Sequence, residues 1–321
     1  MNITVIGCGR WGSLITWYLD HIGHRVTLYG RAASPRMQAF LTTRQNDLLT
    51  LPESVALSTA LDAALESAET VIISIGSQSL RSLLGQSELQ ALRNRTVVLC
   101  MKGLEMGTGA RLSQIAAELL HPSNTVAVWL GPGHVQEFYR GIPNCMVIDS
   151  ENEDVKRRLV QSFSSDLIRF YYGGDMIGNE VGAAAKNVVG IAAGFLDGFE
   201  MSSLKGALMS RGTREVARLI KAMGGSELSA YGLCHLGDYE ATVFSPYSHN
   251  RQFGESFVRG QDYHQLAEGY YTVKALMLLG QRYGVELPIC KAVHDILYEQ
   301  AVPRDVLDGL LRRGLTEEFY D

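Results

Sequence analysis

Three glycines near the start of the chain have the spacing of a phosphate-binding turn. They are Gly7, Gly9 and Gly12 in GCGRWG, directly after the apolar run ITVIG. Where such a turn joins a strand to a helix, the glycines allow a tight turn, close approach of a pyrophosphate, and close strand–helix packing. The spacing alone is weak evidence in a chain with 33 glycines. Its position between a predicted strand and a predicted helix indicates a dinucleotide-binding turn.

The end of the second predicted strand bears on which dinucleotide binds. An acidic residue about 20 residues after the turn binds the ribose 2′-hydroxyl of NAD, whereas an arginine accommodates the 2′-phosphate of NADP. The stretch LYGR places Gly30 where the acid is expected and Arg31 beside it. We therefore expect NADP(H), with NAD(H) as the alternative. The other interpretation of Arg31 is an ordinary solvated loop charge.

Two lysines are candidates for proton transfer and for polarising a carbonyl. Lys186 lies among small apolar residues in EVGAAAKNVVGIAAG, and Lys102 follows the predicted strand TVVLCMKG. A partly desolvated lysine has a lowered pKa and can exchange a proton with a carbonyl or alcohol oxygen near neutral pH. Alternatively, the charged end of Lys186 reaches water. Lys102 lies where substrates meet the carboxyl edge of a parallel sheet, although surface lysines are also common there.

The stretches HLGDYEAT and YSHNRQFGES supply further polar side chains. These are Asp238, Thr242, Ser248, His249, Asn250 and Arg251. An Asn–Arg pair with hydroxyl groups beside it suits a phosphate, because Arg offers a bidentate fork and Asn its amide donors. A generic polar loop has a similar composition, so this pattern is weak by itself.

The elements that position these groups fall into two parts. Up to about residue 173, apolar runs without alternation occur at 3–7, 25–30, 70–76, 96–103, 125–133, 145–150 and 167–172. Such runs indicate strands buried on both faces, as in a doubly wound parallel α/β sheet. The later segments are Ala- and Leu-rich with helical period. We expect a Rossmann-like dinucleotide-binding domain over 1–174 and an all-helical substrate and catalytic domain over 175–321.

Composition limits the classes of function. The chain has 321 residues, 46% of them hydrophobic, and a net charge of −5 without a continuous basic stretch, which argues against nucleic acid as a partner. Its 5 cysteines include no CxxC pair and no cluster at metal-ligand spacing, so we expect no metal site. The start lacks a signal-peptide pattern, and no apolar run reaches a spanning length. We therefore expect a cytoplasmic protein, with a homodimer as the commonest oligomer.

Ten short motifs occur in the order and spacing of one family. They are GCGRWG, GSQSLR, MKGLE, GP at 131–132 with Glu137, GNEVGAAAKN, LMSRG, HLGD, SHNRQFG, AEG and GVELPI. Over residues 1 to about 295, the chain resembles the bacterial type of NAD(P)-dependent glycerol-3-phosphate dehydrogenase. The resemblance implies a helical second domain like that of 6-phosphogluconate dehydrogenase. It also implies reversible reduction of dihydroxyacetone phosphate to sn-glycerol 3-phosphate, which supplies phospholipid synthesis.

The resemblance further implies a role for each matching residue. It makes Lys186 the proton donor, and the catalytic set is Lys186, Asp238, Lys102 and Thr242. The implied ligands of the phosphorylated substrate are Asn187, Ser248, His249, Asn250, Arg251 and Gly131. The implied cofactor-binding residues are Gly7, Gly9, Arg10, Trp11, Gly12, Arg31, Lys102, Arg251 and Glu268.

Two positions depart from the family pattern. His249 stands where the family usually has Arg, and Gly133 where it usually has Ser. A side chain with a pKa of about 6.5 in place of a permanent charge weakens phosphate binding and makes it pH-dependent. One alternative is therefore a related NADP-dependent dehydrogenase for another hydroxy or keto substrate, although such enzymes generally lack the HLGD…NRQFG arrangement. The other is a catalytically weak dinucleotide-binding paralogue.

Overall fold

The computed structural model describes residues 1–312 and residue 318, and the chain divides into two compact units. The first comprises Met1–Met101 and Leu112–Met176, and the second comprises Lys102–Arg111 and the chain from Ile177 onward. No sequence feature indicated that 102–111 belongs with the second unit. The assignment of a dinucleotide-binding domain to 1–174 and a catalytic domain to 175–321 stays a prediction.

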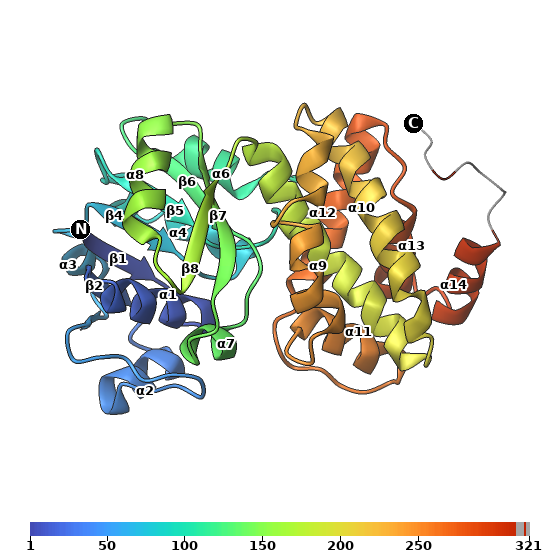
Figure 1. Ribbon diagram of the computed structural model, residues 1–321, viewed down its shortest axis with the longest axis horizontal. Coiled ribbons are helices and arrows are strands. Elements are labelled where there is room, and N and C mark those ends of the chain that lie inside the picture. Colours follow the sequence, from blue (N-terminus) through green and yellow to red (C-terminus); the bar gives the residue numbers. More distant parts are fainter. Residues whose placement is uncertain (313–317, 319–321) are drawn as a thin grey trace. The chain divides into compact units, whose positions relative to one another are not determined.

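An eight-stranded sheet forms the centre of the first unit, in the order β3-β2-β1-β4-β5-β6-β7-β8 (Figure 1). The strands are β1 Asn2–Ile6, β2 Arg25–Tyr29, β3 Ala56–Ser58, β4 Thr70–Ile73, β5 Thr96–Leu99, β6 Thr125–Leu130, β7 Asn144–Ser150 and β8 Ile168–Tyr172. Each pair of neighbours is parallel except β6 and β7. The predicted doubly wound α/β fold is confirmed, but β7 is antiparallel to β6, and β3 was not predicted.

Helices cover this sheet and account for the apolar positions between the strands. They are α1 Arg10–His21, α2 Pro35–Thr43, α3 Leu61–Leu65, α4 Leu80–Leu84, α5 Ser87–Gln90, α6 Leu112–Leu119, α7 Val135–Tyr139 and α8 Glu153–Phe163. On α1 the predicted apolar face is buried, and the Tyr18 hydroxyl donates to the carbonyl of Phe163 at the end of α8. Both helices contribute to one apolar cluster with the fully buried Trp129 of β6. This packing fixes the strand–turn–helix segment that contains the three glycines.

Among the described residues of the second unit, the regular elements are helices, joined by loops and turns. Its helices are α9 Met176–Gly198, α10 Lys205–Ala222, α11 His249–Val258, α12 Glu268–Tyr283, α13 Pro288–Tyr298 and α14 Pro303–Leu311. α9 is buried on nearly all sides, as its predominantly small and apolar sequence predicts. At Gly194 a Cβ would overlap the carbonyl oxygen of Arg251, so α9 and α11 approach as closely as their backbones allow. α9 thereby holds Lys186 at the centre of the helical unit.

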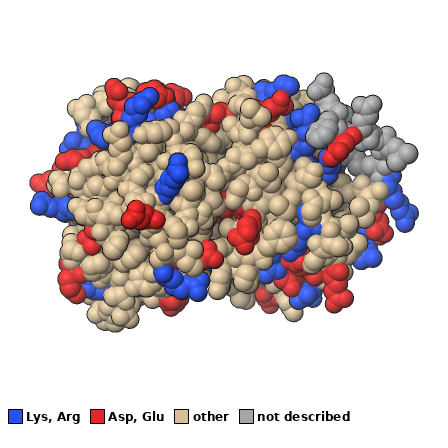
Figure 2. Space-filling view, in the orientation of Figure 1, with Lys and Arg blue, Asp and Glu red and all other residues tan. Residues whose placement is uncertain are grey.

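On the face that Figure 2 shows, the described basic and acidic side chains are interspersed, without a continuous basic band. Among residues 1–312, no helix is both long and apolar enough to cross a membrane. The same residues contain no group of three or more potential metal ligands.

Candidate active site

Lys186, Asp238 and Thr242 form a buried hydrogen-bonded cluster in the second unit. Nζ of Lys186 lies 2.8 Å from Oδ2 of Asp238 and donates to Oγ1 of Thr242 at 2.6 Å. The Thr242 hydroxyl donates its own proton to the backbone carbonyl of Asp238 at 2.7 Å. The hydroxyl therefore accepts from the lysine. A 3₁₀ turn, Leu236–Asp238, followed by a π-helical turn, Glu240–Phe244, brings the aspartate and the threonine to the same side of the segment.

Lys102 contacts the same carboxylate. Its Nζ lies 2.7 Å from Oδ2 of Asp238, and its side chain is 20% exposed, against 1% for Asp238. An isolated bridge pairs Leu104 with Arg111, and Arg111 forms an ion pair with Glu180 of α9 at 2.6 Å. These contacts hold the 102–111 segment against α9, so Lys102 is positioned by the helical unit rather than by the strand that precedes it.

Burial changes the acid–base properties of this cluster. Burial lowers the pKa of Lys186 to about 8; the charge of Asp238 opposes this shift, and the charge of Lys102 adds to it. An ammonium group with such a pKa releases and regains its proton near neutral pH, as a general acid–base catalyst must. The alternative, that the charged end of Lys186 reaches open solvent, does not describe this structure, because only 9% of the side chain is exposed.

Two asparagine side chains link the cluster to the start of α11. Asn187 donates from Nδ2 to the Lys102 carbonyl at 2.8 Å and accepts at Oδ1 from Asn250 at 3.0 Å. Oδ1 of Asn250 accepts from the backbone N–H of Gly269, next to Glu268 at the start of α12, at 2.9 Å. Each amide nitrogen carries two hydrogens, so these bonds leave each side chain one further N–H. The predicted phosphate ligands Asn187 and Asn250 therefore lie in one fixed chain of amides.

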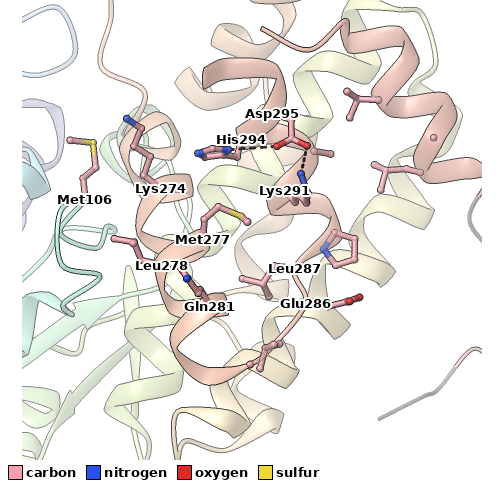
Figure 3. A pocket seen from close by; sticks show the side chains of 18 residues that line it. Met106, Lys274, Met277, Leu278, Gln281, Glu286, Leu287, Lys291, His294 and Asp295 are labelled. Atoms are coloured by element: carbon pink, nitrogen blue, oxygen red, sulfur yellow. Dashed lines mark hydrogen bonds and ion pairs between the residues drawn. The ribbon is translucent and has the colours of Figure 1, made fainter. Parts of the chain in front are cut away.

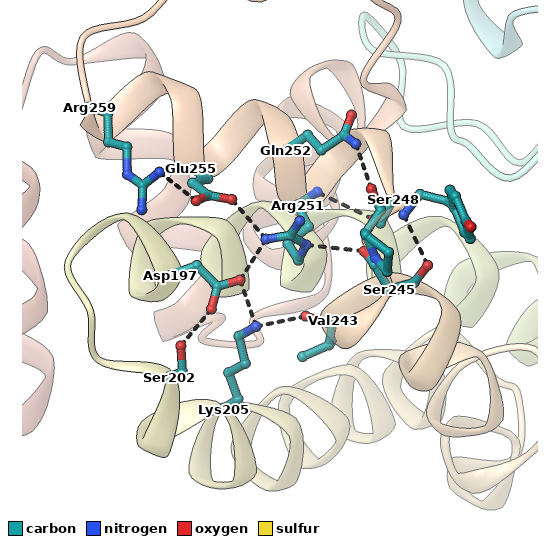
Figure 4. A network of polar contacts seen from close by, with 12 residues as sticks. Asp197, Ser202, Lys205, Val243, Ser245, Ser248, Arg251, Gln252, Glu255 and Arg259 are labelled. Atoms are coloured by element: carbon teal, nitrogen blue, oxygen red, sulfur yellow. Dashed lines mark hydrogen bonds and ion pairs between the residues drawn. The ribbon is translucent and has the colours of Figure 1, made fainter.

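Arg251 is held by carboxylates of its own unit (Figure 4). Its Nη1 lies 2.8 Å from Asp197 and 2.8 Å from Glu255, and its Nε donates to the Ser245 carbonyl at 3.1 Å. Burial alone would raise the pKa of Asp197, but hydrogen bonds from Lys205, Ser202 and Arg251 outweigh it and lower this pKa. The guanidinium thus fixes α11 to α9, a structural task that sequence reasoning missed because Asp197 is 54 residues away in the chain.

The neighbouring residues Ser248 and His249 begin α11. Ser248 is the N-cap, and its Oγ accepts from the backbone N–H of Arg251 at 3.3 Å. Nδ1 of His249 lies 2.7 Å from the Tyr263 hydroxyl, a contact that no sequence motif indicated. The predicted phosphate loop therefore contains side chains with three different roles. Ser248 caps the helix, His249 contacts Tyr263, and Arg251 is paired with carboxylates.

A buried histidine beneath the cluster was also missed. Nδ1 of His235 lies 2.8 Å from the Gly182 carbonyl, and its Nε2 lies 2.8 Å from the hydroxyl of Tyr239. Burial lowers the pKa of His235 to about 4, so the ring is neutral near pH 7. The carbonyl can only accept, so Nδ1 carries the proton and Nε2 accepts from the tyrosine. This pair holds the turn that contains Asp238 against α9, and the HLGD motif is the only sequence signal near it.

The glycine turn of the first unit has the geometry that a dinucleotide needs. Gly7 has φ +117°, and a Cβ there would overlap the Ser74 carbonyl, while a Cβ at Gly12 would overlap the Gly7 carbonyl. At Gly9, however, the nearest atom to a Cβ would be Nη1 of Arg36, at 3.8 Å. Internal packing thus explains two of the glycines and leaves open space at Gly9, the N-cap of α1. A pyrophosphate approaching the backbone there fits this space.

Other predicted cofactor-binding residues lie near the glycine turn in the sequence or in the first unit. A Cβ at Gly30 would lie 2.9 Å from Sγ of Cys8 and 2.9 Å from the Met37 side chain, so an acidic residue has no room there. Arg31 is exposed next to it. Arg10 is the first residue of α1, and the Trp11 ring packs on Phe138 with centroids 6.1 Å apart.

The first unit also contains the two glycines near the end of β6. Gly131 and Gly133 have φ +127° and +143°, values that favour glycine. A Cβ at Gly133 would overlap the ring of Phe138. The departure from serine at this position therefore has a local steric reason.

A cavity of about 930 Å³ in the second unit lies apart from the cluster (Figure 3). Residues of α12, α13 and α14 line most of it, and the charged Lys291 at its edge is paired with Asp295 at 2.5 Å. None of the predicted site residues is among the described residues that line it. The candidate active site is therefore the lysine–aspartate cluster and not this cavity.

The family is decided by models that match nearly the whole chain. The model of the NAD-dependent glycerol-3-phosphate dehydrogenase N-terminus matches residues 2–156, and that of the C-terminus matches residues 175–308. The chain belongs to this family. The family resemblance inferred from the motifs is thereby confirmed.

Relatives of this chain align with it over nearly the full length of both proteins. A protein of Thermoanaerobacter sp. named glycerol-3-phosphate dehydrogenase (NAD(P)+) is 32% identical over 331 residues, covering 100% of this chain and 99% of the relative. The protein of the same name from Thiobacillus denitrificans is 35% identical over 332 residues, covering 99% of this chain and 100% of the relative. The crystal structure of glycerol-3-phosphate dehydrogenase from Coxiella burnetii has a TM-score of 0.89 at 27% identity, over 97% of this chain and 99% of that one.

More distant structures share the fold alone. The complex of D-mandelate dehydrogenase with NADH has a TM-score of 0.62 at 14% identity, and 2-dehydropantoate 2-reductase from Methylococcus capsulatus has 0.62 at 16%. Both align over at least 94% of this chain. They extend the shared architecture to dehydrogenases for other substrates.

Proposed function

We propose that this chain catalyses the reversible reduction of dihydroxyacetone phosphate to sn-glycerol 3-phosphate with NAD(P)H. The observation that carries the proposal is the buried Lys186, 2.8 Å from Asp238 in a chain that belongs to the family. The bound nicotinamide supplies the hydride. Reduction of a ketone also requires a proton at the carbonyl oxygen, and Lys186 is the group with the chemistry to provide it.

The other members of the cluster prepare Lys186 for this step. Asp238 favours its protonated form through charge, and the Thr242 hydroxyl accepts one N–H at 2.6 Å and so restricts the direction of Nζ. Lys102 places a second positive charge at the same carboxylate, where it stabilises negative charge on the substrate oxygen. We assign Lys186 as the proton donor, Lys102 as the electrostatic stabiliser, and Asp238 and Thr242 as groups that orient Lys186.

The substrate phosphate is assigned to the start of α11. Asn187 and Asn250 each retain an amide N–H, and His249 and Ser248 adjoin them. We assign Arg251 a different role from the one its motif suggested: its bonds to Asp197 and Glu255 make it a support for this loop. Gly131 remains a proposed substrate contact, and Glu268 a proposed cofactor contact.

The cofactor is assigned to the turn at Gly7, Gly9 and Gly12, with Arg10 and Trp11 at the start of α1. NADP(H) is proposed as the preferred form because Arg31 stands beside Gly30, whose position is closed to an acidic side chain. NAD(H) lacks only the 2′-phosphate contact and remains a usable cofactor. The two relatives are named as NAD(P)+ enzymes, a name that covers both forms.

The test is NADPH oxidation with dihydroxyacetone phosphate against dihydroxyacetone, with identification of the alcohol formed. The proposal requires turnover that depends on the phosphate and yields sn-glycerol 3-phosphate. Turnover with another ketone or keto acid but not with these two would favour a related dehydrogenase, which the departure at His249 makes the second candidate. NADPH binding without reduction of any ketone would indicate a catalytically weak paralogue.

We further propose that the product supplies phospholipid synthesis and that the protein acts in the cytoplasm as a homodimer. Family membership and the lack of a spanning helix among residues 1–312 support the first two proposals. The dimer is the commonest symmetric state of such proteins. Light scattering at several protein concentrations tests it, and a constant mass of one chain would contradict it.

A further inference from the structure

We infer that His249 binds the substrate phosphate only in its protonated form, because hydrogen bonds to Tyr263 and Gln252 place the single proton of the neutral ring on Nδ1. Binding of the phosphorylated ketone then takes up a proton at His249. This inference rests on the proposed function, and it concerns a residue at which this chain departs from the family pattern.

The direction of three consecutive hydrogen bonds carries the argument. Nε2 of Gln252 donates to the carbonyl of Pro246 at 2.5 Å, an oxygen that can only accept (Figure 4). The amide oxygen of Gln252 therefore faces Tyr263, whose hydroxyl donates to it at 3.2 Å. The hydroxyl has one proton, so it accepts from His249, whose Nδ1 lies 2.7 Å away.

Ring packing keeps this arrangement in place. The Tyr263 ring meets that of Phe253 nearly edge-on, with centroids 5.9 Å apart, and Phe253 lies on the same helix as His249. Neutral imidazole carries one proton, so a proton fixed on Nδ1 leaves a lone pair on Nε2. A lone pair repels phosphate oxygens, whereas the N–H of an imidazolium attracts them. Charge and hydrogen bonding thus favour the protonated ring whenever phosphate is bound.

The charged or titratable side chains on the elements around His249 include Arg251 and Glu255 on α11, Asp262, Tyr263 and His264 on the following segment, Glu268, Tyr270, Tyr271 and Lys274 on α12, and Lys186 and Asp197 on α9. Arg251 is held between Asp197 and Glu255, and Lys186 is held by Asp238. The side chain of His264 is exposed. It therefore offers a control histidine in the same segment.

The experiment measures KM for dihydroxyacetone phosphate from pH 6 to 9 at saturating NADPH, for the wild type and for His249→Arg. In the wild type, KM should rise with pH above the usual imidazole range, approaching about tenfold per pH unit. His249→Arg carries a permanent charge and should reduce the rise to whatever the titration of the substrate itself produces. An equal slope in both proteins would overturn the inference.

Two variants test the hydrogen-bond chain. Tyr263→Phe removes the acceptor at Nδ1 and lets the neutral ring carry its proton on Nε2, so the rise in KM should be shallower than in the wild type. His264→Gln should keep the wild-type slope. A Tyr263→Phe slope equal to that of the wild type, or a flat profile in His264→Gln, would contradict the assignment.

A binding measurement separates this inference from the proposed function. Calorimetry of sn-glycerol 3-phosphate in buffers of different ionisation enthalpy, at pH 7.5, should show greater proton uptake by the wild type than by His249→Arg. Equal uptake would overturn the inference even if the enzyme is active. Failure to bind the ligand or reduce the ketone at any pH would instead contradict the proposed function on which it rests.

Discussion

Lys186 and Lys102 share one carboxylate oxygen: their Nζ atoms lie 2.8 and 2.7 Å from Oδ2 of Asp238. The two ammonium groups outnumber the one carboxylate, and all three side chains are mostly buried. Burial lowers the pKa of Lys186 to about 8, and the two neighbours act on this pKa in opposite directions: Asp238 raises it and Lys102 lowers it.

Removing the charge of Asp238 or of Lys102 should shift the pH dependence of kcat in opposite directions. Lys186 donates a proton in ketone reduction, so kcat should fall as pH rises through about 8. Asp238→Asn removes the charge that raises the pKa of Lys186, and should move this fall to lower pH. Lys102→Met removes the charge that lowers it, and should move the fall to higher pH. Shifts in the same direction, measured as kcat against pH at saturating substrate, would contradict the shared-carboxylate account.

Substitutions at two glycines of the turn should have different effects, one on stability and the other on cofactor binding. Gly12→Ala forces a Cβ onto the Gly7 carbonyl and should lower the free energy of unfolding by about 1–3 kcal/mol or more. Gly9→Ala meets no protein atom closer than 3.8 Å and should fold normally, but bind NADPH at least about tenfold more weakly. Urea unfolding and NADPH titration measure the two effects. Normal NADPH affinity in Gly9→Ala would contradict the placement of the pyrophosphate.

Arg31 should determine the preference between the two cofactors. Arg31→Gln should weaken NADPH binding by about 10-fold to 100-fold, the value of a hydrogen bond to a charged group, and leave NADH binding nearly unchanged. Arg157→Gln makes the same charge change at an exposed position on α8 and serves as the control. Equal losses for NADPH and NADH in Arg31→Gln would show that this side chain does not contact the 2′-phosphate.

The sequence anticipated the site where local pattern and chemistry coincide. The glycine turn is visible because it follows an apolar run, and Lys186 because a cation among small apolar residues is unusual. It did not reveal that β7 is antiparallel to β6, because the hydrophobicity of a strand carries no information about direction. The three-residue β3 is too short to leave a pattern.

The sequence also did not predict contacts between residues that are far apart in the chain. The motif around Arg251 predicts a phosphate ligand. In the structure, however, Arg251 forms an ion pair with Asp197, which lies on another helix. Tyr263 fixes His249 from a segment without a motif. Such roles depend on the packing of α9 and α11, which no single stretch of sequence encodes.

The Phe138 ring should account for glycine in place of serine at position 133. Gly133→Ser places a Cβ in the Phe138 ring at φ +143° and should lower the free energy of unfolding by about 1–3 kcal/mol. The double variant with Phe138→Leu should recover part of this loss relative to Phe138→Leu alone, because the smaller side chain leaves space. Equal costs of Gly133→Ser in both backgrounds, measured by urea unfolding, would show that the ring is not the obstacle.

The central claim is that Lys186 supplies the proton in ketone reduction, and Lys186→Met tests it most directly. Methionine matches the unbranched four-atom stem of lysine without the ammonium group, and Lys102 remains to pair with Asp238. The measurement is kcat for dihydroxyacetone phosphate with NADPH, beside NADPH affinity and unfolding of the same preparation. We predict a loss of about 10²–10⁴-fold in kcat with a folded protein that still binds NADPH. A folded variant whose kcat stays within a few-fold of the wild type would contradict the account.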